Sequence, residues 1–443
     1  MDTSFSRNRL ITLENLIYYL IFRNQQVLSQ DIVSFFGNVN DFDIPTRQAI
    51  IKRMNILNFD VWNHILRQFR QNIYFHLNLY KLKDYIVIAV DGSFLDLPSH
   101  PALNHYFGGH QTRKISVDDI KKPQAKVSMI YDVLNRMILD FSVGHYRTSE
   151  IPMLFTHLRE LMNDFKDKKI IILADRYYGS AELFKYCEMY DMKYIVRSKK
   201  NFFKHYISQY PNENDFSIEI QIDNAWMKRM KNDEIREYVQ NHPHMKLRVV
   251  RGKYQYIEKN GKKEKECTVE GQYFTNLEEK EFDTKEIIDI YHLERWHIET
   301  AYDVLKNDLD VEQFNTHNPI GIINQIMGKV IFYNIEKLVY IDAKEKIIQK
   351  KENKYVYIPN NKNIINILHS IKFVKEFVFG LTRKTIDKII EISSREKIPV
   401  RKERHYKRWN KFLRSIPTRR HRIDGRRNPP VVKGKTGFVT TNH

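Results

Sequence analysis

Apolar positions in residues 1–80 recur every three or four places along the chain. Three stretches show this spacing: Leu10 to Phe22, Thr46 to Leu57 and Val61 to Ile73. Such spacing is typical of helices that bury one face. We therefore predict an N-terminal helical domain over residues 1–80.

The middle of these stretches is basic. Thr46 follows Pro45 and fits a helix N-cap, and the expected helix carries Arg47, Lys52 and Arg53. One hypothesis is that this is the recognition helix of a helix-turn-helix-like unit, with the three cations on DNA. The alternative is a small bundle with a solvated basic face.

From Tyr85 the pattern changes to short, continuous apolar runs. The run from Tyr85 ends at Asp91, and a second run from Lys168 ends at Asp175. Runs of this length are typical of strands buried on both faces of a sheet. Around them we predict a hairpin (126–132 and 137–144), helices from Ser149 to Asn163 and Gly179 to Tyr190, and a strand from Lys193 to Val196. This order predicts an α/β fold with a mixed sheet flanked by helices.

Residues 200–283 alternate polar and apolar positions, as half-buried strands do. The clearest stretches are Phe216 to Ile222, Lys246 to Tyr254 and Thr268 to Leu277. We predict a β-rich insertion here, followed by one long helix from Thr284 to Leu309 and another from Pro319 to Ala343.

The predicted domain organisation follows these changes of pattern. It consists of the N-terminal domain (1–80), the first part of the core (81–199), the insertion (200–283), the second part of the core (284–345), a C-terminal helical region (346–400) and a basic tail (401–443).

Charge narrows the choice of partner. The 443 residues include 73 Lys or Arg against 54 Asp or Glu, a net charge of +19, which favours a polyanion such as nucleic acid. After residue 400 there are 14 Lys or Arg against two acids. We expect this tail to be a partly disordered arm that contacts phosphates without reading bases.

Other classes of protein are disfavoured. No apolar run reaches the roughly 20 residues needed to span a bilayer, and the N-terminus lacks a signal pattern. The two cysteines, Cys187 and Cys267, fit buried thiols in a reducing cytoplasm better than a disulfide framework. We expect neither secretion nor membrane insertion.

Three acids stand out as candidates for chemistry. Asp91 and Asp175 each follow a buried strand, and Glu299 lies in the helix after the insertion. Strand ends are where functional groups converge in open sheets, and gathered carboxylates can hold two Mg²⁺ ions about 4 Å apart for phosphoryl transfer. From the pattern alone, an Asp at a strand end is more often a helix cap or a turn former.

The helix around Glu299 adds a stripe of polar residues. At about 100° per residue, Tyr291, Arg295, Glu299 and Lys306 fall on one face. In an active site, Glu299 would bind a metal, Arg295 and Lys306 would contact DNA phosphates, and Tyr291 would stack or donate to a phosphate. The alternative is an Arg–Glu pair on a solvated helix.

Three segments of the chain together resemble the DDE transposases of the insertion-sequence-four family of bacteria. They are AVDGSFLDLP around Asp91, IILADRYYGSAELF around Asp175, and YFTNL followed by IYHLERWHIETAYDVLKNDLDVEQF around Glu299. The similarity runs from the Thr46 helix to about residue 340. Two positions depart from that family: three residues rather than two separate Tyr291 from Arg295, and Tyr177 replaces a common glycine.

The resemblance implies a fold, a cofactor and a reaction. The expected fold is a ribonuclease-H-like core with a β-strand insertion before the third acid. Asp91, Asp175 and Glu299 are expected to bind two Mg²⁺ ions, with Mn²⁺ as a substitute. Water would cleave DNA at the terminal inverted repeats, and the freed 3′-hydroxyl would join target DNA in a cut-and-paste reaction. Studied relatives pass through a DNA hairpin.

The resemblance also implies partners and further contacts. We expect a homodimer that pairs two DNA ends in a synaptic complex, in a prokaryotic cytoplasm near the nucleoid. Arg176 and Tyr178 of the second segment are assigned to DNA. Relatives stack a flipped base on an aromatic side chain, and Trp226 is the candidate, although a core tryptophan is the alternative.

Two other functions stay open at this point. One is a nuclease on the same core that cuts DNA without joining strands. The other is an inactive or domesticated copy that only binds DNA.

Overall fold

The computed structural model describes residues 11–24, 27–39, 43–77, 79–110, 122–199, 201–260, 263–349, 354–400, 432–434 and 437–439. The chain divides into two compact units, one of residues 1–255 and 268–400, the other of residues 256–267 and 401–443. In the second unit, β11 (Val432–Gly434) pairs with β12 (Gly437–Val439) in antiparallel fashion. The predicted basic tail otherwise lies outside the described residues.

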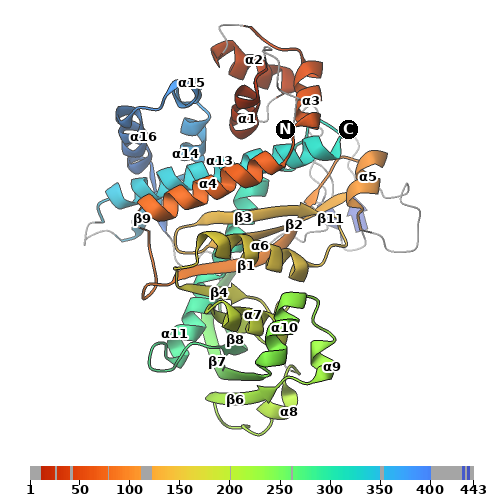
Figure 1. Ribbon diagram of the computed structural model, residues 1–443. Helices are drawn as coiled ribbons and strands as arrows, with labels where there is room; N and C mark the ends of the chain where they lie inside the picture. The colour runs from red at the N-terminus through yellow and green to blue at the C-terminus, as the bar shows by residue number, and fades with distance from the viewer. Residues whose placement is uncertain are drawn as a thin grey trace. The chain divides into compact units, whose positions relative to one another are not determined.

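A single mixed sheet organises the first unit (Figure 1). Its strands are β1 (Ile86–Asp96), β2 (Gln124–Asp132), β3 (Met137–Gly144), β4 (Ile170–Ala174), β5 (Lys193–Arg197), β6 (Asp215–Gln221), β7 (His244–Asn260) and β8 (Lys263–Thr275). Their order is β3-β2-β1-β4-β5-β8-β7-β6.

Strand directions give this sheet its ribonuclease-H-like character. β1, β2 and β3 are antiparallel, while β4 and β5 continue parallel to β1. β8 then pairs antiparallel with β5, so the strands of the insertion extend the core sheet. The predicted fold class, a mixed α/β sheet flanked by helices, is confirmed.

Helices cover both faces of the sheet because β1 is apolar on both sides. Val87 and Ala89 pack in a core with α12 (Trp296–Asp303) and α13 (Pro319–Lys346). Ile86, Ile88 and Val90 pack in a second core with α6 (Glu150–Asp164) and α7 (Ala181–Met189). Continuous apolar strands of this kind are typical of sheets buried on both faces.

The N-terminal part is helical, as predicted. Its helices are α1 (Leu13–Phe22), α2 (Leu28–Val39), α3 (Arg47–Ile56) and α4 (Asp60–His76). Thr46 caps α3 by accepting a hydrogen bond from the Ala49 amide at 3.2 Å, which confirms the predicted cap. α2 was not among the predicted helices. α1, α3 and α4 pack on α13, where the Trp62 indole donates to Asn324 Oδ1 at 2.8 Å.

The remaining elements are short. They are α5 (Pro101–Phe107), α8 (Lys204–Ile207), α9 (Asn224–Met227), α10 (Asp233–Asn241), α11 (Thr284–Asp289), β9 (Val356–Pro359), α14 (Asn361–Leu368), α15 (Ile371–Phe379), α16 (Arg383–Arg395) and β10 (Lys397–Val400). The insertion therefore contains three helices that the alternating pattern did not predict. No helix in the described part of the chain is both long and apolar enough to cross a bilayer.

Candidate functional site

The two aspartates lie where β1 and β4 separate. The prediction that a strand ends at Asp91 was wrong, because β1 continues to Asp96. Its parallel pairing with β4 ends at Ala89, and from there β1 pairs with β2 alone. Asp175 directly follows β4. Both aspartates therefore lie at the carboxyl-terminal side of the paired segments of two neighbouring strands. This is the usual place for functional groups in such sheets.

The helix that carries Glu299 is not regular. Instead of one α-helix over Thr284–Leu309, two π-helical segments, Ile290–Glu294 and Val304–Asp308, flank α12. A π turn contains an additional residue and is frequent at functional sites. The first π segment contains Tyr291 and the three residues that separate it from Arg295.

Hydrogen bonds attach this helix to β1 beside Asp91. The Tyr302 hydroxyl donates to the backbone carbonyl of Asp91 at 2.9 Å. One turn further on, the Lys306 ammonium donates to Ser93 Oγ at 2.9 Å and to the Phe94 carbonyl at 2.7 Å. Glu299 precedes Tyr302 by three residues, so these bonds hold the third acid near the first.

The charges of Asp175 and Glu299 act on the ionisation of Asp91. Burial raises the pKa of Asp91 to about 7; Arg295 and the Gly92 amide oppose this rise, and the Asp175 and Glu299 carboxylates add to it. Both carboxylates therefore lie within electrostatic reach of Asp91. A divalent cation bound among these groups would relieve both the repulsion and the cost of burial.

The chemistry of the donors fits a hard cation, but the described residues do not form a closed metal site. Among them no group of three His, Cys, Asp or Glu side chains is close enough to hold an ion. Glu299 Oε1 accepts a hydrogen bond from Arg295 at 2.9 Å, and Asp175 Oδ1 accepts one from the Tyr177 amide at 2.7 Å. Carboxylate oxygens are the ligands that Mg²⁺ prefers, so the residues fit the ion in kind.

The residues predicted to contact DNA fall into two groups, one accessible to solvent and one buried or bonded within the protein. Arg176, beside Asp175, and Arg47 and Lys52 on α3 are exposed. Arg295 is partly buried, with its guanidinium 5.6 Å from the centre of the Tyr291 ring. These four cations have access to solvent, as phosphate contacts require.

The other predicted DNA contacts are buried or engaged within the protein. Arg53, Tyr178 and Tyr291 are 8%, 0% and 3% exposed, and Lys306 donates to β1. Trp226 on α9 is half-buried and stacks on Phe203, with 5.3 Å between ring centres. In the structure described here these side chains support the protein interior rather than an open surface.

Sequence reasoning missed Glu150, the first residue of α6. Its Oε2 accepts a hydrogen bond from the Tyr178 hydroxyl at 2.6 Å, and its Oε1 accepts one from the Lys126 ammonium. The carboxyl also packs against Gly92, the residue after Asp91. Many helices begin with glutamate, so one sequence offers no signal for this residue.

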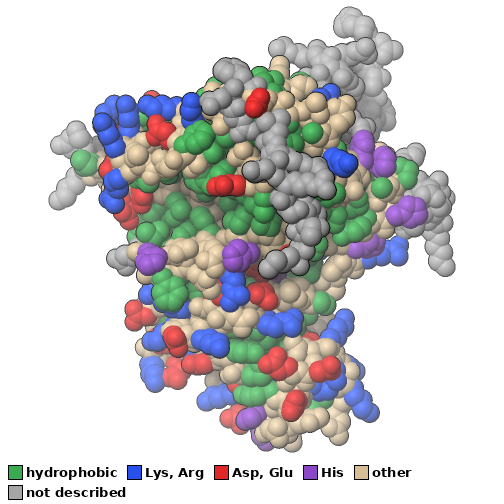
Figure 2. All heavy atoms as spheres, turned by 45° about the horizontal axis from the view of Figure 1, so that its top comes forward, with side chains coloured by type: hydrophobic (Ala, Val, Ile, Leu, Met, Phe, Trp, Pro, Cys, Tyr) green, Lys and Arg blue, Asp and Glu red, His purple; other side chains and the backbone are tan. Residues whose placement is uncertain are grey.

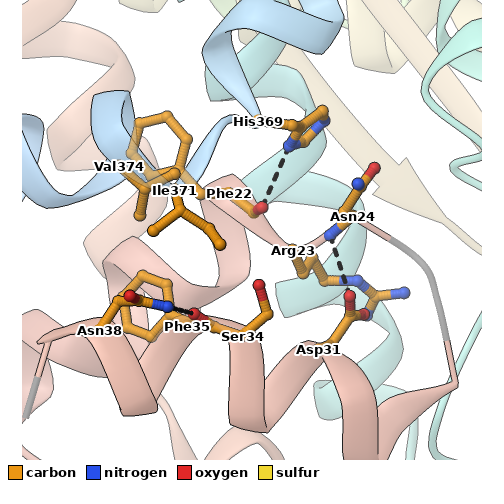
Figure 3. A pocket seen from close by; sticks show the side chains of 10 residues that line it. All are labelled: Phe22, Arg23, Asn24, Asp31, Ser34, Phe35, Asn38, His369, Ile371 and Val374. Atoms are coloured by element: carbon orange, nitrogen blue, oxygen red, sulfur yellow. Dashed lines mark hydrogen bonds between the residues drawn. The ribbon is translucent and has the colours of Figure 1, made fainter.

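A small pocket lies elsewhere in the first unit, between α1–α2 and α14–α15 (Figure 3). It is lined by Arg23, Asp31 and His369, among others, and none of the predicted site residues reaches it. The Asn24 amide donates to Asp31 Oδ1 at 3.3 Å, and His369 Nδ1 donates to the Phe22 carbonyl at 3.1 Å. Burial lowers the pKa of His369 to about 3. These polar groups join the N-terminal and C-terminal helices.

Basic side chains do not form one continuous stripe over the visible face. Figure 2 shows Lys and Arg gathered at the upper left, over the α15–α16 region, while acidic and basic side chains intermingle over the insertion at the bottom. Exposed cations on α16 include Arg383, Lys384 and Lys388, but Arg383 pairs with Asp387 at 3.7 Å. Charge on this face alone therefore does not trace a DNA path.

The fold and the acids together define the class of protein. It is a protein with a ribonuclease-H-like core and carboxylates where the central strands β1 and β4 separate. Residues 82–335 match the model of the transposase DDE domain family. Since this match covers more than half of the chain, the protein belongs to that family. The matched range contains Asp91, Asp175 and Glu299.

Two further comparisons complete this result. No curated protein matches the chain. A solved structure, the cryo-EM structure of the piggyBac transposase synaptic complex with hairpin DNA, aligns with 99% of this chain and 88% of its own. The TM-score is 0.36 and the sequence identity is 12%.

Proposed function

We propose that this protein is a cut-and-paste transposase of the insertion-sequence-four type. It cleaves DNA at the ends of a mobile element and joins the freed 3′-hydroxyl to target DNA. The observation that carries the proposal is the meeting of the acid-bearing segments: Asp91 lies where β1 leaves β4, Asp175 follows β4, and Tyr302 on the helix of Glu299 donates to the Asp91 carbonyl. Membership of the transposase DDE domain family supports it.

In this proposal Asp91, Asp175 and Glu299 hold two divalent ions, Mg²⁺ or in its place Mn²⁺. When bound, the ions would activate the attacking oxygen and stabilise the leaving oxygen of the phosphodiester. Arg295 neutralises Glu299 in the metal-free protein through their hydrogen bond. If Glu299 held an ion, the Arg295 guanidinium would be available to a DNA phosphate, for which its planar donors are suited.

DNA is held by the exposed cations. Arg176 contacts phosphate beside the acids, and Arg47 and Lys52 on α3 contact DNA outside the reacting segment. Trp226 is proposed to stack a displaced base, which requires it to leave Phe203. The protein acts as a homodimer that pairs two ends, in the prokaryotic cytoplasm.

Tyr178, Tyr291, Arg53 and Lys306 take supporting roles. Their burial or their bonds to the protein keep the acid-bearing segments in place. A DNA contact by any of them requires the side chain to leave its present partners. Hydrogen bonds that orient metal ligands commonly matter nearly as much as the ligands.

Joining of DNA strands tests the proposal. Purified protein is incubated with Mg²⁺, a supercoiled target plasmid and pre-cut DNA made from the segments that flank its reading frame. We expect joined product, lost in Asp91→Asn and Glu299→Gln. Cleavage without joining would support the nuclease, and DNA binding without either reaction would support an inactive or domesticated copy.

A further inference from the structure

We propose that Glu150 is a positioning residue of the acid site. Its carboxyl lies between β1, just after Asp91, and the loop just after Asp175, and it sets the separation of the two aspartates. The inference rests on the proposed function, because it concerns the same acids. Glu150 touches neither substrate nor ion in this assignment and acts through its neighbours.

The contact with β1 is made at Gly92. A Cβ atom on Gly92 would lie 2.5 Å from Cδ of Glu150 and 2.6 and 2.8 Å from its two oxygens. Real Cβ atoms do not approach other atoms so closely, so any side chain at position 92 would displace the carboxyl. The glycine next to Asp91 therefore lets a second carboxylate lie directly on the strand.

The contact with the other aspartate is made through Tyr178. Its hydroxyl donates to Glu150 Oε2 at 2.6 Å, and its backbone amide donates to the Asp175 carbonyl at 3.2 Å. The Tyr178 side chain is completely buried, which leaves it little freedom. A shift of Glu150 would therefore move the loop that carries Asp175.

Two features keep Glu150 itself in place. Lys126 on β2 forms an ion pair with Glu150 and lies 4.2 Å from the centre of the Phe94 ring. The position of Glu150 at the start of α6 also places its charge at the positive end of the helix.

The α6 helix is in turn secured to the edge strand β3. His157 Nδ1 lies 2.7 Å from Asp140 Oδ2, and His157 Nε2 lies 3.2 Å from Ser142 Oγ. The set resembles a Ser-His-Asp arrangement. With the His157 side chain 1% exposed, it serves here as a bridge between α6 and β3, and so fixes the helix that begins at Glu150.

The test measures metal binding directly. Mn²⁺ affinity is determined by electron paramagnetic resonance on the full-length protein without DNA, for the wild type and for Tyr178→Phe, Gly92→Ala and Glu150→Gln. The control is Tyr190→Phe, which removes a Tyr–Glu hydrogen bond of 2.8 Å, from Tyr190 to Glu234, outside the site. Circular dichroism melts confirm that each variant is folded.

We expect Tyr178→Phe and Gly92→Ala to raise the Mn²⁺ dissociation constant about 10-fold, the lower end for lost outer hydrogen bonds at metal sites. Glu150→Gln keeps an acceptor for the Tyr178 hydroxyl, so its Mn²⁺ affinity should fall less. The Mn²⁺ affinity of Tyr190→Phe should equal that of the wild type. Equal affinity in wild type, Tyr178→Phe and Gly92→Ala would overturn the inference. If Asp91→Asn also left Mn²⁺ binding unchanged, the proposed function itself would fail.

Discussion

The hydroxyl of Tyr302 donates a hydrogen bond of 2.9 Å to the backbone carbonyl of Asp91. Asp91 and Glu299 are distant in sequence, and this bond joins the strand of one to the helix of the other. Lys306 adds two bonds to the same strand. The position of Glu299 therefore depends on where these hydrogen bonds hold its helix along β1.

Removing the Tyr302 hydroxyl should weaken the attachment of α12 to β1. Tyr302→Phe loses one partly buried hydrogen bond, which costs about 1 kcal/mol. We expect a lower free energy of unfolding in urea and slower strand cleavage, because Glu299 becomes less well placed. Tyr238→Phe, which loses a longer Tyr–Glu bond of 3.3 Å far from the acids, is the control. Unchanged cleavage by Tyr302→Phe would show that the bond does not position Glu299.

Lys306 offers a test between two roles. Its ammonium bonds to Ser93 and Phe94, so Lys306→Met should slow cleavage while the slope of log affinity against log salt stays constant. A phosphate contact would instead reduce that slope by about 1. The exposed Lys285 on α11 provides a matched Lys→Met control. A reduced slope for Lys306→Met alone would assign Lys306 to DNA.

The raised pKa of Asp91 predicts a dependence of stability on pH. Its pKa rises from 3.8 to about 7 on folding, so the folded protein binds this proton more tightly than the unfolded chain does. The group therefore destabilises the metal-free protein progressively as pH rises from about 4 to about 7. At 1.36 kcal/mol per pKa unit, the effect reaches about 4 kcal/mol at most.

Asp91→Asn removes this destabilisation and provides the measurement. We expect the variant to be more stable than the wild type at pH 8, with the difference shrinking as pH falls and vanishing below about pH 4. Thermal unfolding in the presence of a chelator records this comparison. A variant that is less stable than the wild type at pH 8 would contradict the environment assigned to Asp91.

The tail should strengthen DNA binding without selecting sequence. Ending the chain after Val400 removes 14 Lys or Arg and two acids. Fewer neutralised phosphates release fewer counterions, so affinity should fall and the salt slope should flatten. Fluorescence anisotropy over a salt series measures both. An unchanged slope would mean that the tail does not touch DNA.

Much of the fold could be predicted because the apolar pattern is local. The continuous run before Asp175 predicted β4, and Thr46 predicted the start of α3. The end of β1 could not be predicted in this way. Beyond Val90 the strand is held by backbone bonds to β2, and these do not depend on the apolar character of its own residues.

The site was harder to predict than the fold. Asp91, Asp175 and Glu299 were chosen by position and by resemblance, and they stay predictions as ligands. Glu150 and Tyr302 act through contacts with residues distant in sequence, which periodicity does not show. The π-helical segment that contains Tyr291 is a change of backbone winding that apolar periodicity does not show.

Crystals soaked in Mn²⁺ and measured at the manganese absorption edge test the central claim most directly. We predict two anomalous peaks about 4 Å apart, with oxygens of Asp91, Asp175 and Glu299 as ligands and Arg295 turned away from Glu299. The account would be contradicted if manganese bound elsewhere, or if no manganese bound while Glu299 stayed paired with Arg295.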